Sequence, residues 1–129
     1  MNMEKYKRNF EKLKKARLQF EKILKEFETD IIRDAAIQRF EFTYELLWKT
    51  LKAFLEEYHG IRVNSPRQTF KEAYRIELIS NEEVFLDMLE ARNLLAHTYS
   101  ETESIAIYQK FPAYLPVISA AISQLDSEA

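Results

Sequence analysis

The 129-residue sequence has very little of what interrupts helices, with one glycine and three prolines. Because these two residue types most often mark turns and chain breaks, their scarcity predicts a mostly helical chain with short connections. Cysteine is absent, which excludes a disulfide framework and a thiolate metal site. The two histidines, His59 and His97, are too far apart in sequence to form a metal-binding motif, so we expect neither a metal nor a cofactor.

Long apolar runs are also missing, because no stretch of about 18 apolar residues occurs. The N-terminus is basic and amphipathic and lacks the apolar core of a signal peptide. Of all residues 47% are apolar, which is enough for a hydrophobic core in one helical-bundle domain spanning residues 1–129. We therefore expect a soluble, cytoplasmic protein with no membrane contact.

The charged residues are unevenly distributed, although the net charge is only −2. Residues 1–25 carry nine Lys or Arg and three Asp or Glu, a balance of +6. Residues 76–129 carry two basic and nine acidic residues, a balance of −7. Two interpretations are open: the two regions attract one another as solvated faces of one fold, or the basic segment binds RNA or an acidic partner protein.

Apolar residues recur at three- and four-residue steps in five segments, and this spacing predicts helices. The segments cover residues 3–27, 31–58, 66–76, 81–99 and 105–125. Strand signals are absent and the connections are short, so the predicted fold is all-α: an antiparallel four-helix up-down bundle with an additional short helix. The second segment has a wide apolar face and should be the central helix.

Local signals predict where some of these helices begin and end. Gly60, the only glycine, suits the left-handed position that follows a helix. Ser65, with a proline next to it, is typical of a helix start, and Ser80 with Glu83 fits a capping box. Pro112 and a second proline four residues later lie inside the last segment, so we expect a kink or a break near residues 111–113.

Arg92 occupies a position where the pattern of segment 81–99 favours an apolar side chain. The apolar stripe of that segment consists of Phe85, Met88, Leu89, Leu95, Ala96 and Tyr99. A lone guanidinium on a core-facing stripe is unfavourable unless an anion meets it. Two explanations stay open: Arg92 forms a structural ion pair with Asp87, Glu41 or Glu45, or it binds an anionic ligand.

Asn93, His97 and Tyr99 follow Arg92 within two turns and carry groups that handle phosphates or protons. At about 100° per residue, Arg92 and Tyr99 are nearly eclipsed, whereas Arg92 and His97 are about 140° apart. One straight helix therefore cannot bring Arg92 and His97 to one small group. A distortion at His97 would do so, and so would a second copy across a dyad, which predicts a homodimer with the site at its interface. The plainer alternatives are that His97 interacts with the helix dipole and that Tyr99 is a core aromatic.

Residues 92–99, with the sequence RNLLAHTY, match the R-x4-H-x-Y signature of HEPN proteins. Three further segments, residues 38–49, 65–67 and 87–93, resemble the nucleotidyltransferase substrate-binding protein family. The resemblance covers residues 5–125. The signature alone would be weak, and the upstream segments in the same order make the resemblance specific.

The resemblance implies a HEPN-like four-helix bundle that forms a homodimer and is encoded beside a minimal nucleotidyltransferase, its partner in a two-gene toxin–antitoxin-like module. It also implies a metal-independent ribonuclease site at the dimer interface, in which Arg92 stabilises phosphate charge and His97 acts as acid or base. Tyr99 would accept AMP from the partner, which would silence the site. Asn93 is a supporting residue that could orient His97 or bind a phosphate oxygen.

Two other functions fit the same residues. The protein could be a non-catalytic subunit that presents a nucleotide or another substrate to the transferase. It could also be a helical interaction module in which Arg92 is purely structural. The chain is not expected to be the transferase itself, since it has neither a Gly-Ser nucleotide-binding loop nor a paired-aspartate metal motif.

Overall fold

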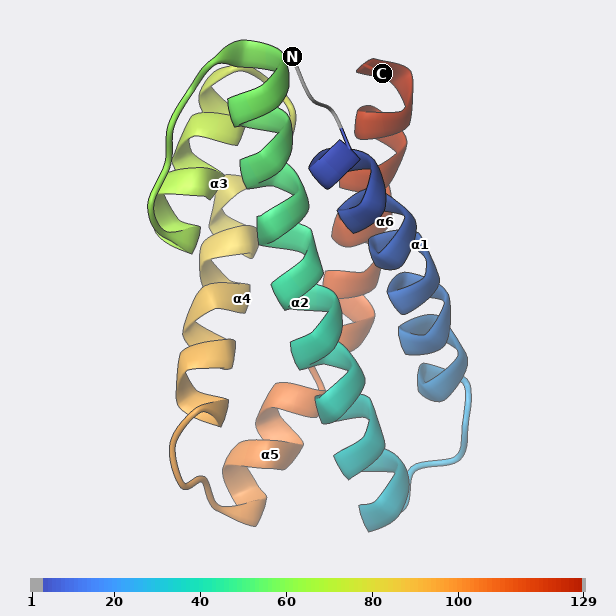
Figure 1. The fold of residues 1–129 in the computed structure, drawn as a ribbon. Coiled ribbons are helices and arrows are strands. Elements are labelled where there is room, and N and C mark those ends of the chain that lie inside the picture. The colour runs from blue at the N-terminus through green and yellow to red at the C-terminus, as the bar shows by residue number, and fades with distance from the viewer. Residues whose placement is uncertain (1–3, 129) are drawn as a thin grey trace.

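The computed structural model describes residues 4–128, which form six helices and contain no strand. In chain order the helices are α1 (Glu4–Leu24), α2 (Asp30–His59), α3 (Pro66–Arg75), α4 (Glu82–Leu95), α5 (Glu101–Tyr108) and α6 (Phe111–Glu128). α1, α2, α4 and the pair α5–α6 run antiparallel to their neighbours, and the short α3 packs against α2 and α4 (Figure 1). The predicted all-α four-helix bundle with an additional short helix is therefore confirmed.

α2 is the central helix, as predicted, because it contacts α1, α3, α4 and α5. Thr29 caps its start, where the threonine side chain accepts a hydrogen bond from the Ile32 amide at 3.1 Å. Gly60 follows its end with a φ of 66°, and the Gly60 amide donates to the Glu56 carbonyl at 3.1 Å. A side chain would be strained at this φ, so the chain has its one glycine where the backbone needs it.

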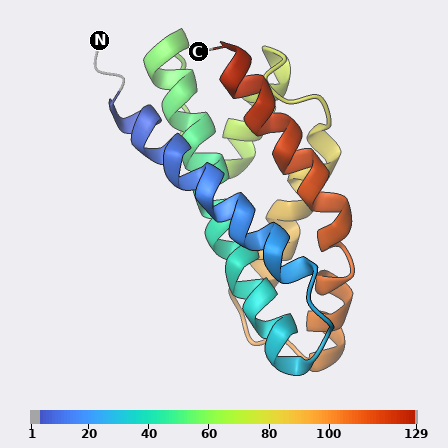
Figure 2. The same cartoon turned by 90° about the vertical axis from the view of Figure 1, so that its right-hand side faces the viewer.

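Aromatic side chains fill the centre of the bundle. Phe40 of α2 stacks on Phe111 of α6 with ring centroids 4.9 Å apart, and Phe20 of α1 meets Phe111 edge-on at 5.1 Å. Tyr44 of α2 contacts Phe70 of α3 at 6.0 Å. Figure 2 shows from the side that α1 crosses α2 and that α6 lies next to α1. Interlocked rings of this kind favour one arrangement of the helices, which holds the side chains on α2, α3 and α4 in fixed positions relative to one another.

The predicted ends of two helices are wrong. α1 stops at Leu24 instead of continuing to residue 27, and Phe27 lies in the following connection with 87% of its surface exposed. α4 is capped by Asn81 and not by the predicted Ser80, since the Asn81 side chain accepts a hydrogen bond from the Val84 amide at 3.4 Å. Asparagine and serine are both strong capping residues, and the sequence alone did not separate these two neighbours.

The far end of α4 differs more from the prediction, because the helix stops at Leu95 and not near Tyr99. Ser100 and Glu103 form a complete capping box that begins α5. The chain must leave the helical conformation before such a start, since an N-cap residue is non-helical. His97 and Tyr99 therefore lie in the connection between two helices, and they do not continue the α4 face that carries Arg92.

The predicted last helix, 105–125, is divided into α5 and α6, which are bent by 46°. Pro112 has no amide hydrogen to donate to the Tyr108 carbonyl, so a continuous helix would lose that bond. The predicted break is present, but it lies at residues 109–110 and not at 111–113. Pro116 remains inside α6.

No single helix among residues 4–128 has the length and apolar composition needed to cross a membrane. α5 and α6 have that length and apolar composition only when they are taken together, as a bent pair. The apolar side chains of α6 are used within the bundle, where it buries Phe111, Tyr114, Ile118, Ala121, Ile122 and Leu125.

Candidate functional site

Arg92 lies on α4 and lines an open hollow of about 500 Å³ that is bordered by α2, the start of α3 and α4. The hollow is lined by Tyr44, Glu45, Trp48, Ser65, Pro66, Arg67, Leu89, Arg92 and Asn93. These residues come from the segments 38–49, 65–67 and 87–93, which are far apart in the sequence. The bundle brings the three segments together around one opening.

Arg92 is half-buried, and no described residue places a carboxylate within 4 Å of its guanidinium. Two of the partners considered for it are engaged elsewhere. Asp87 pairs with Lys110 at 3.3 Å, and Glu45 pairs with Lys49 at 3.3 Å. The structural ion pair that was one explanation of Arg92 is therefore not formed in the described chain, and its charge is available to an anion.

The positive charge of Arg92 interacts electrostatically with two groups of α2, Glu41 and Tyr44. Burial raises the pKa of the Glu41 carboxyl above its ordinary value, and the positive charge of Arg92 offsets part of that rise. Burial also raises the pKa of the Tyr44 hydroxyl, and the positive charge of Arg92 offsets part of that rise. Within residues 4–128 that hydroxyl has no hydrogen-bond partner. A buried hydroxyl without a partner is unfavourable, and here it lies in the wall of the Arg92 hollow.

Arg67 adds a second positive charge to the hollow. It pairs with Glu90 at 3.1 Å, and the two side chains are 50% and 66% exposed. Solvent screens a pair this exposed, so it contributes little to stability and can be exchanged for another anion. Arg67, Glu41 and Tyr44 were not among the site residues predicted from the sequence. The signal that pointed toward them is that all three lie in segments 38–49 and 65–67, which carry the resemblance.

Of the four predicted site residues, the structure brings together only Arg92 and Asn93, which line the same hollow. His97 is exposed in the α4–α5 connection and is not among the residues that line that hollow. Tyr99 is 37% exposed and lines a different, smaller hollow of about 250 Å³. This separation follows from the end of α4 at Leu95, which carries the chain away from the Arg92 face.

The hollow beside Tyr99 is acidic. Arg33, whose side chain is only 8% exposed, lies in it and is held by Glu28 at 2.9 Å and by Asp30 at 2.8 Å. Glu101 of α5 is 3.8 Å from the same guanidinium. The charge of Arg33 is thus already matched by carboxylates, in contrast to the charge of Arg92. Sequence patterns gave no indication of Arg33, because it lies outside the signature.

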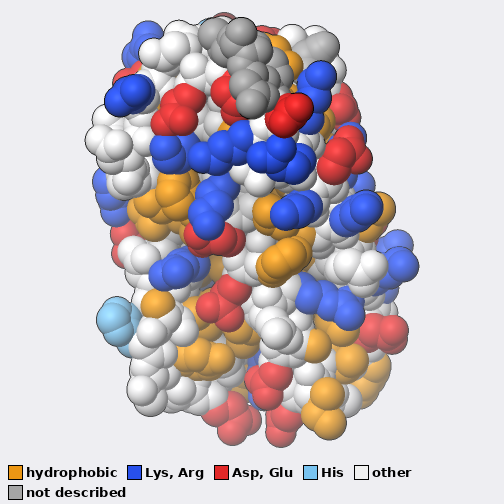
Figure 3. Space-filling view, viewed as in Figure 1, with side chains coloured by type: hydrophobic (Ala, Val, Ile, Leu, Met, Phe, Trp, Pro, Cys, Tyr) orange, Lys and Arg blue, Asp and Glu red, His pale blue; other side chains and the backbone are white. Residues whose placement is uncertain are grey.

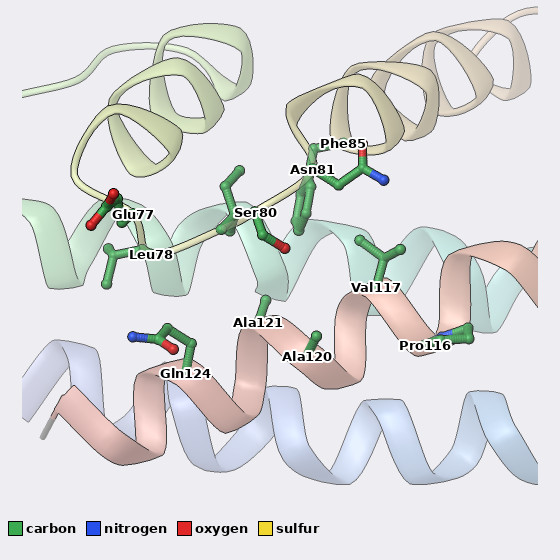
Figure 4. Close-up of a pocket in the computed structure, with 11 residues that line it drawn as sticks. Glu77, Leu78, Ser80, Asn81, Phe85, Pro116, Val117, Ala120, Ala121 and Gln124 are labelled. Carbon is green, nitrogen blue, oxygen red and sulfur yellow. The ribbon is translucent and has the colours of Figure 1, made fainter.

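A further hollow of about 330 Å³ lies between α6 and the α3–α4 connection (Figure 4). Its lining is mostly apolar or neutral, and Glu77 is the charged residue in it. It contains none of the predicted site residues. The described residues also include no group of three His, Asp or Glu side chains arranged to hold a metal ion.

Comparison with known proteins identifies a family and a relative. Residues 2–127 match the model of a family described as nucleotidyltransferase substrate binding protein like. A relative from Haemophilus influenzae, named Probable ribonuclease HepT, is 30% identical over 100 residues, which is 74% of this chain and 68% of that protein.

Solved structures similar to this one include the following two. A protein from Thermus thermophilus is 33% identical with a TM-score of 0.83, over 88% of this chain and 98% of its own. HI0074 from Haemophilus influenzae is 25% identical with a TM-score of 0.70, over 97% of this chain and 99% of its own. The latter is described as revealing the fold of a substrate binding domain of a nucleotidyltransferase.

Proposed function

Since this chain belongs to the nucleotidyltransferase substrate binding protein like family, we propose that it is the partner subunit of a minimal nucleotidyltransferase encoded nearby, with a metal-independent ribonuclease site of its own. The two proteins form a two-gene toxin–antitoxin-like module, in which the site acts on RNA and the transferase silences it. Arg92 and His97 are the catalytic residues, Asn93 supports them, and Tyr99 accepts AMP.

The unpaired guanidinium of Arg92 in an open hollow is the observation that supports this proposal most. Cleavage of RNA through the 2′-hydroxyl builds negative charge on the scissile phosphate, and a cation held beside that phosphate lowers the barrier. Arg92 need not release a carboxylate before it meets the phosphate. Asn93, in the same hollow, can donate a hydrogen bond to a phosphate oxygen. His97 accepts the proton of the 2′-hydroxyl and returns a proton to the leaving oxygen, the general acid–base role that histidine takes most often in enzymes.

The position of His97 supports the proposal that the protein is a homodimer. Within one chain His97 lies beyond the end of α4 and is not among the residues that line the Arg92 hollow, so we propose that the two groups meet on one phosphate across a dimer. Two copies related by a dyad, with their α4 helices facing each other, place His97 of the partner subunit near Arg92. The site is complete only in this dimer.

Tyr99 is accessible enough to accept AMP, because 37% of its surface is exposed. The chain has no metal-ligand cluster in the described residues, so the transferase brings ATP and its Mg²⁺ to the tyrosine. Within one chain AMP on Tyr99 would lie beside Arg33 and not beside Arg92. Silencing would therefore come from bulk and negative charge next to His97, two residues away, and not from neutralisation of Arg92 in the same chain.

The test uses the purified chain without its partner and fluorescently labelled single-stranded and structured RNA. Arg92→Ala and His97→Ala each abolish cleavage, with circular dichroism showing that both variants stay folded. His59→Ala is the matched control, because His59 is the other histidine, is exposed at the end of α2 and is expected to have no role. RNA that stays intact after prolonged incubation with the wild-type protein would reject the ribonuclease proposal.

A non-catalytic substrate-binding subunit is the second candidate. The Arg92 hollow favours it, because the partly exposed ring of Trp48 lines it together with two arginines, a combination that suits the base and the phosphates of a nucleotide. Calorimetric titration with nucleotides separates the two candidates. Nucleotide binding that is lost in Trp48→Ala, together with RNA that stays intact, makes the chain a subunit that presents a substrate.

A further inference from the structure

A groove of about 690 Å³ lies between α1 and α2, and its charge differs from that of the hollows around Arg92 and Tyr99. Lys12 and Lys15 of α1 and Arg39, Phe42 and Leu46 of α2 are among the residues that line it. Among residues 4–128, no carboxylate lines this groove, whereas the hollows around Arg92 and Tyr99 contain acidic residues. In Figure 3, Lys and Arg side chains gather on the upper and middle parts of the viewed face, with acidic side chains among them, while acidic and apolar side chains predominate at its lower end.

The cations of the groove form no ion pair within the described chain, although Glu11 lies close enough to Lys15 for the lysine charge to help lower the pKa of the Glu11 carboxyl. Lys14 and Arg17, elsewhere on α1, pair with glutamates of the same helix at 2.8 Å and 3.5 Å. Across residues 4–128, no carboxylate lies within 4 Å of Lys12, Lys15 or Arg39. Within residues 4–128, none of the ion pairs of α1 reaches the acidic segment 76–129. The charge of Asp126 acts on Lys14, which does not line the groove.

Phe42 gives the groove an exposed aromatic surface. The ring is 60% exposed, next to the nearly buried Leu46. Arg39 is held in place because its Nη1 donates to the Gln19 carbonyl at 2.9 Å, a contact that orients the guanidinium without cancelling its charge. Unpaired cations around an accessible ring are the features by which proteins bind single-stranded nucleic acid, since phosphates contact the cations and bases stack on the ring.

We propose that this groove binds single-stranded RNA, with phosphates on Lys12, Lys15 and Arg39 and a base stacked on Phe42. The choice of RNA rests on the proposed ribonuclease function, and the groove adds a binding region that is separate from the cleavage residues. Phe42 lines the groove on one flank of α2, and Glu45 lines the Arg92 hollow on the other flank. A strand held in the groove therefore reaches the Arg92 hollow by crossing one helix.

The experiment measures the fluorescence anisotropy of a labelled oligoadenylate of about 12 nucleotides, a length within the range of single-strand binding sites. All proteins carry His97→Ala so that the probe is not cut. Phe42→Leu keeps an apolar side chain but removes the stacking surface, and it weakens binding about fivefold or more. Phe42→Trp restores stacking and binds as well as the parent. A fully paired RNA of the same length is unaffected by either change, because its bases cannot reach the ring.

The charged side of the groove is tested by the double variant Lys12→Gln, Lys15→Gln. Loss of two phosphate contacts lowers the slope of log affinity against log salt concentration by about 1.4, the value for single strands. Lys7→Gln, Lys25→Gln is the matched control, since it removes the same charge from exposed lysines that do not line the groove. Circular dichroism verifies that each variant is folded.

The proposal would be overturned if the two double lysine variants changed RNA affinity and its salt dependence equally and Phe42→Leu did not change RNA affinity. RNA would then be held only by general attraction to a basic helix. A change in dimerisation in Phe42→Leu without a change in RNA affinity would also overturn it, because the groove would then be a protein interface. Cleavage by the wild type that is insensitive to the groove variants would refute the groove and leave the ribonuclease intact. Groove-dependent RNA binding by a wild type that cuts nothing would support the groove and refute the ribonuclease.

Discussion

Replacing Arg92 by methionine tests whether this residue serves binding or stability. No described carboxylate lies within 4 Å of its guanidinium, so the replacement breaks no ion pair. Methionine keeps much of the apolar stem and removes the cost of holding a half-buried charge. We expect the free energy of unfolding to change by no more than about 1 kcal/mol, which is a shift in Tm of roughly 4 °C for a chain of this size. A structural arginine in a buried pair would instead cost about 3–5 kcal/mol.

Urea unfolding followed by circular dichroism measures this change. Arg33→Met is the control, because Arg33 is held by Glu28 at 2.9 Å and by Asp30 at 2.8 Å. It should lose clearly more stability than Arg92→Met, since charge-assisted hydrogen bonds disappear with it. A loss of about 3 kcal/mol or more in Arg92→Met would refute the reasoning and make Arg92 a structural residue.

Three further predictions concern α2 and Tyr99. Thr43→Val should lower the free energy of unfolding by about 1 kcal/mol, measured by thermal unfolding, because the Thr43 hydroxyl donates to the Arg39 carbonyl at 2.7 Å. Thr50→Val should not lower it, because the Thr50 hydroxyl is buried without a partner in the described residues, and equal losses in the two variants would contradict this reasoning. Glu41→Gln should stabilise the protein at neutral pH, because burial raises the pKa of Glu41 and folding therefore favours its protonated form. Urea titrations should show that this gain in stability shrinks as the pH falls and Glu41 takes up its proton. A gain that does not depend on pH would be inconsistent with that cause. Tyr99→Phe should gain no AMP by mass spectrometry after incubation with the transferase and ATP while it still cuts RNA, and an AMP adduct on the variant would identify another acceptor.

The fold could be predicted from the sequence because helix periodicity and scarce turn residues agree along the whole chain. The wide apolar face of residues 31–58 identified the central helix, and Gly60 identified its end. Helix ends were harder, because they depend on competition between neighbouring caps. Asn81 rather than Ser80 caps α4, and the capping box at Ser100 ends the helical path before Tyr99.

The site was predicted only in part, because helix periodicity does not define where a helix ends or how the connection after it runs. Arg92 and Asn93 lie where helix periodicity places them, side by side on the last turn of α4. His97 and Tyr99 depend on the connection after α4, and periodicity says nothing about a connection. Glu41 was considered from the sequence only as one of three possible ion-pair partners of Arg92. Its place near Arg92, like that of Arg67 in the Arg92 hollow, depends on packing of α2 and α3 against α4, which a single sequence does not fix.

Mixing two inactive variants tests most directly the claim that Arg92 of one subunit works with His97 of the partner subunit. Arg92→Ala and His97→Ala dimers are combined, allowed to exchange subunits, and assayed for RNA cleavage. Half of the dimers are then mixed, and each mixed dimer has one intact site, so cleavage should return to roughly one quarter of the wild-type rate. A mixture that stays inactive, while the wild type cuts RNA and subunit exchange is verified by mass spectrometry, would contradict a site shared between two chains.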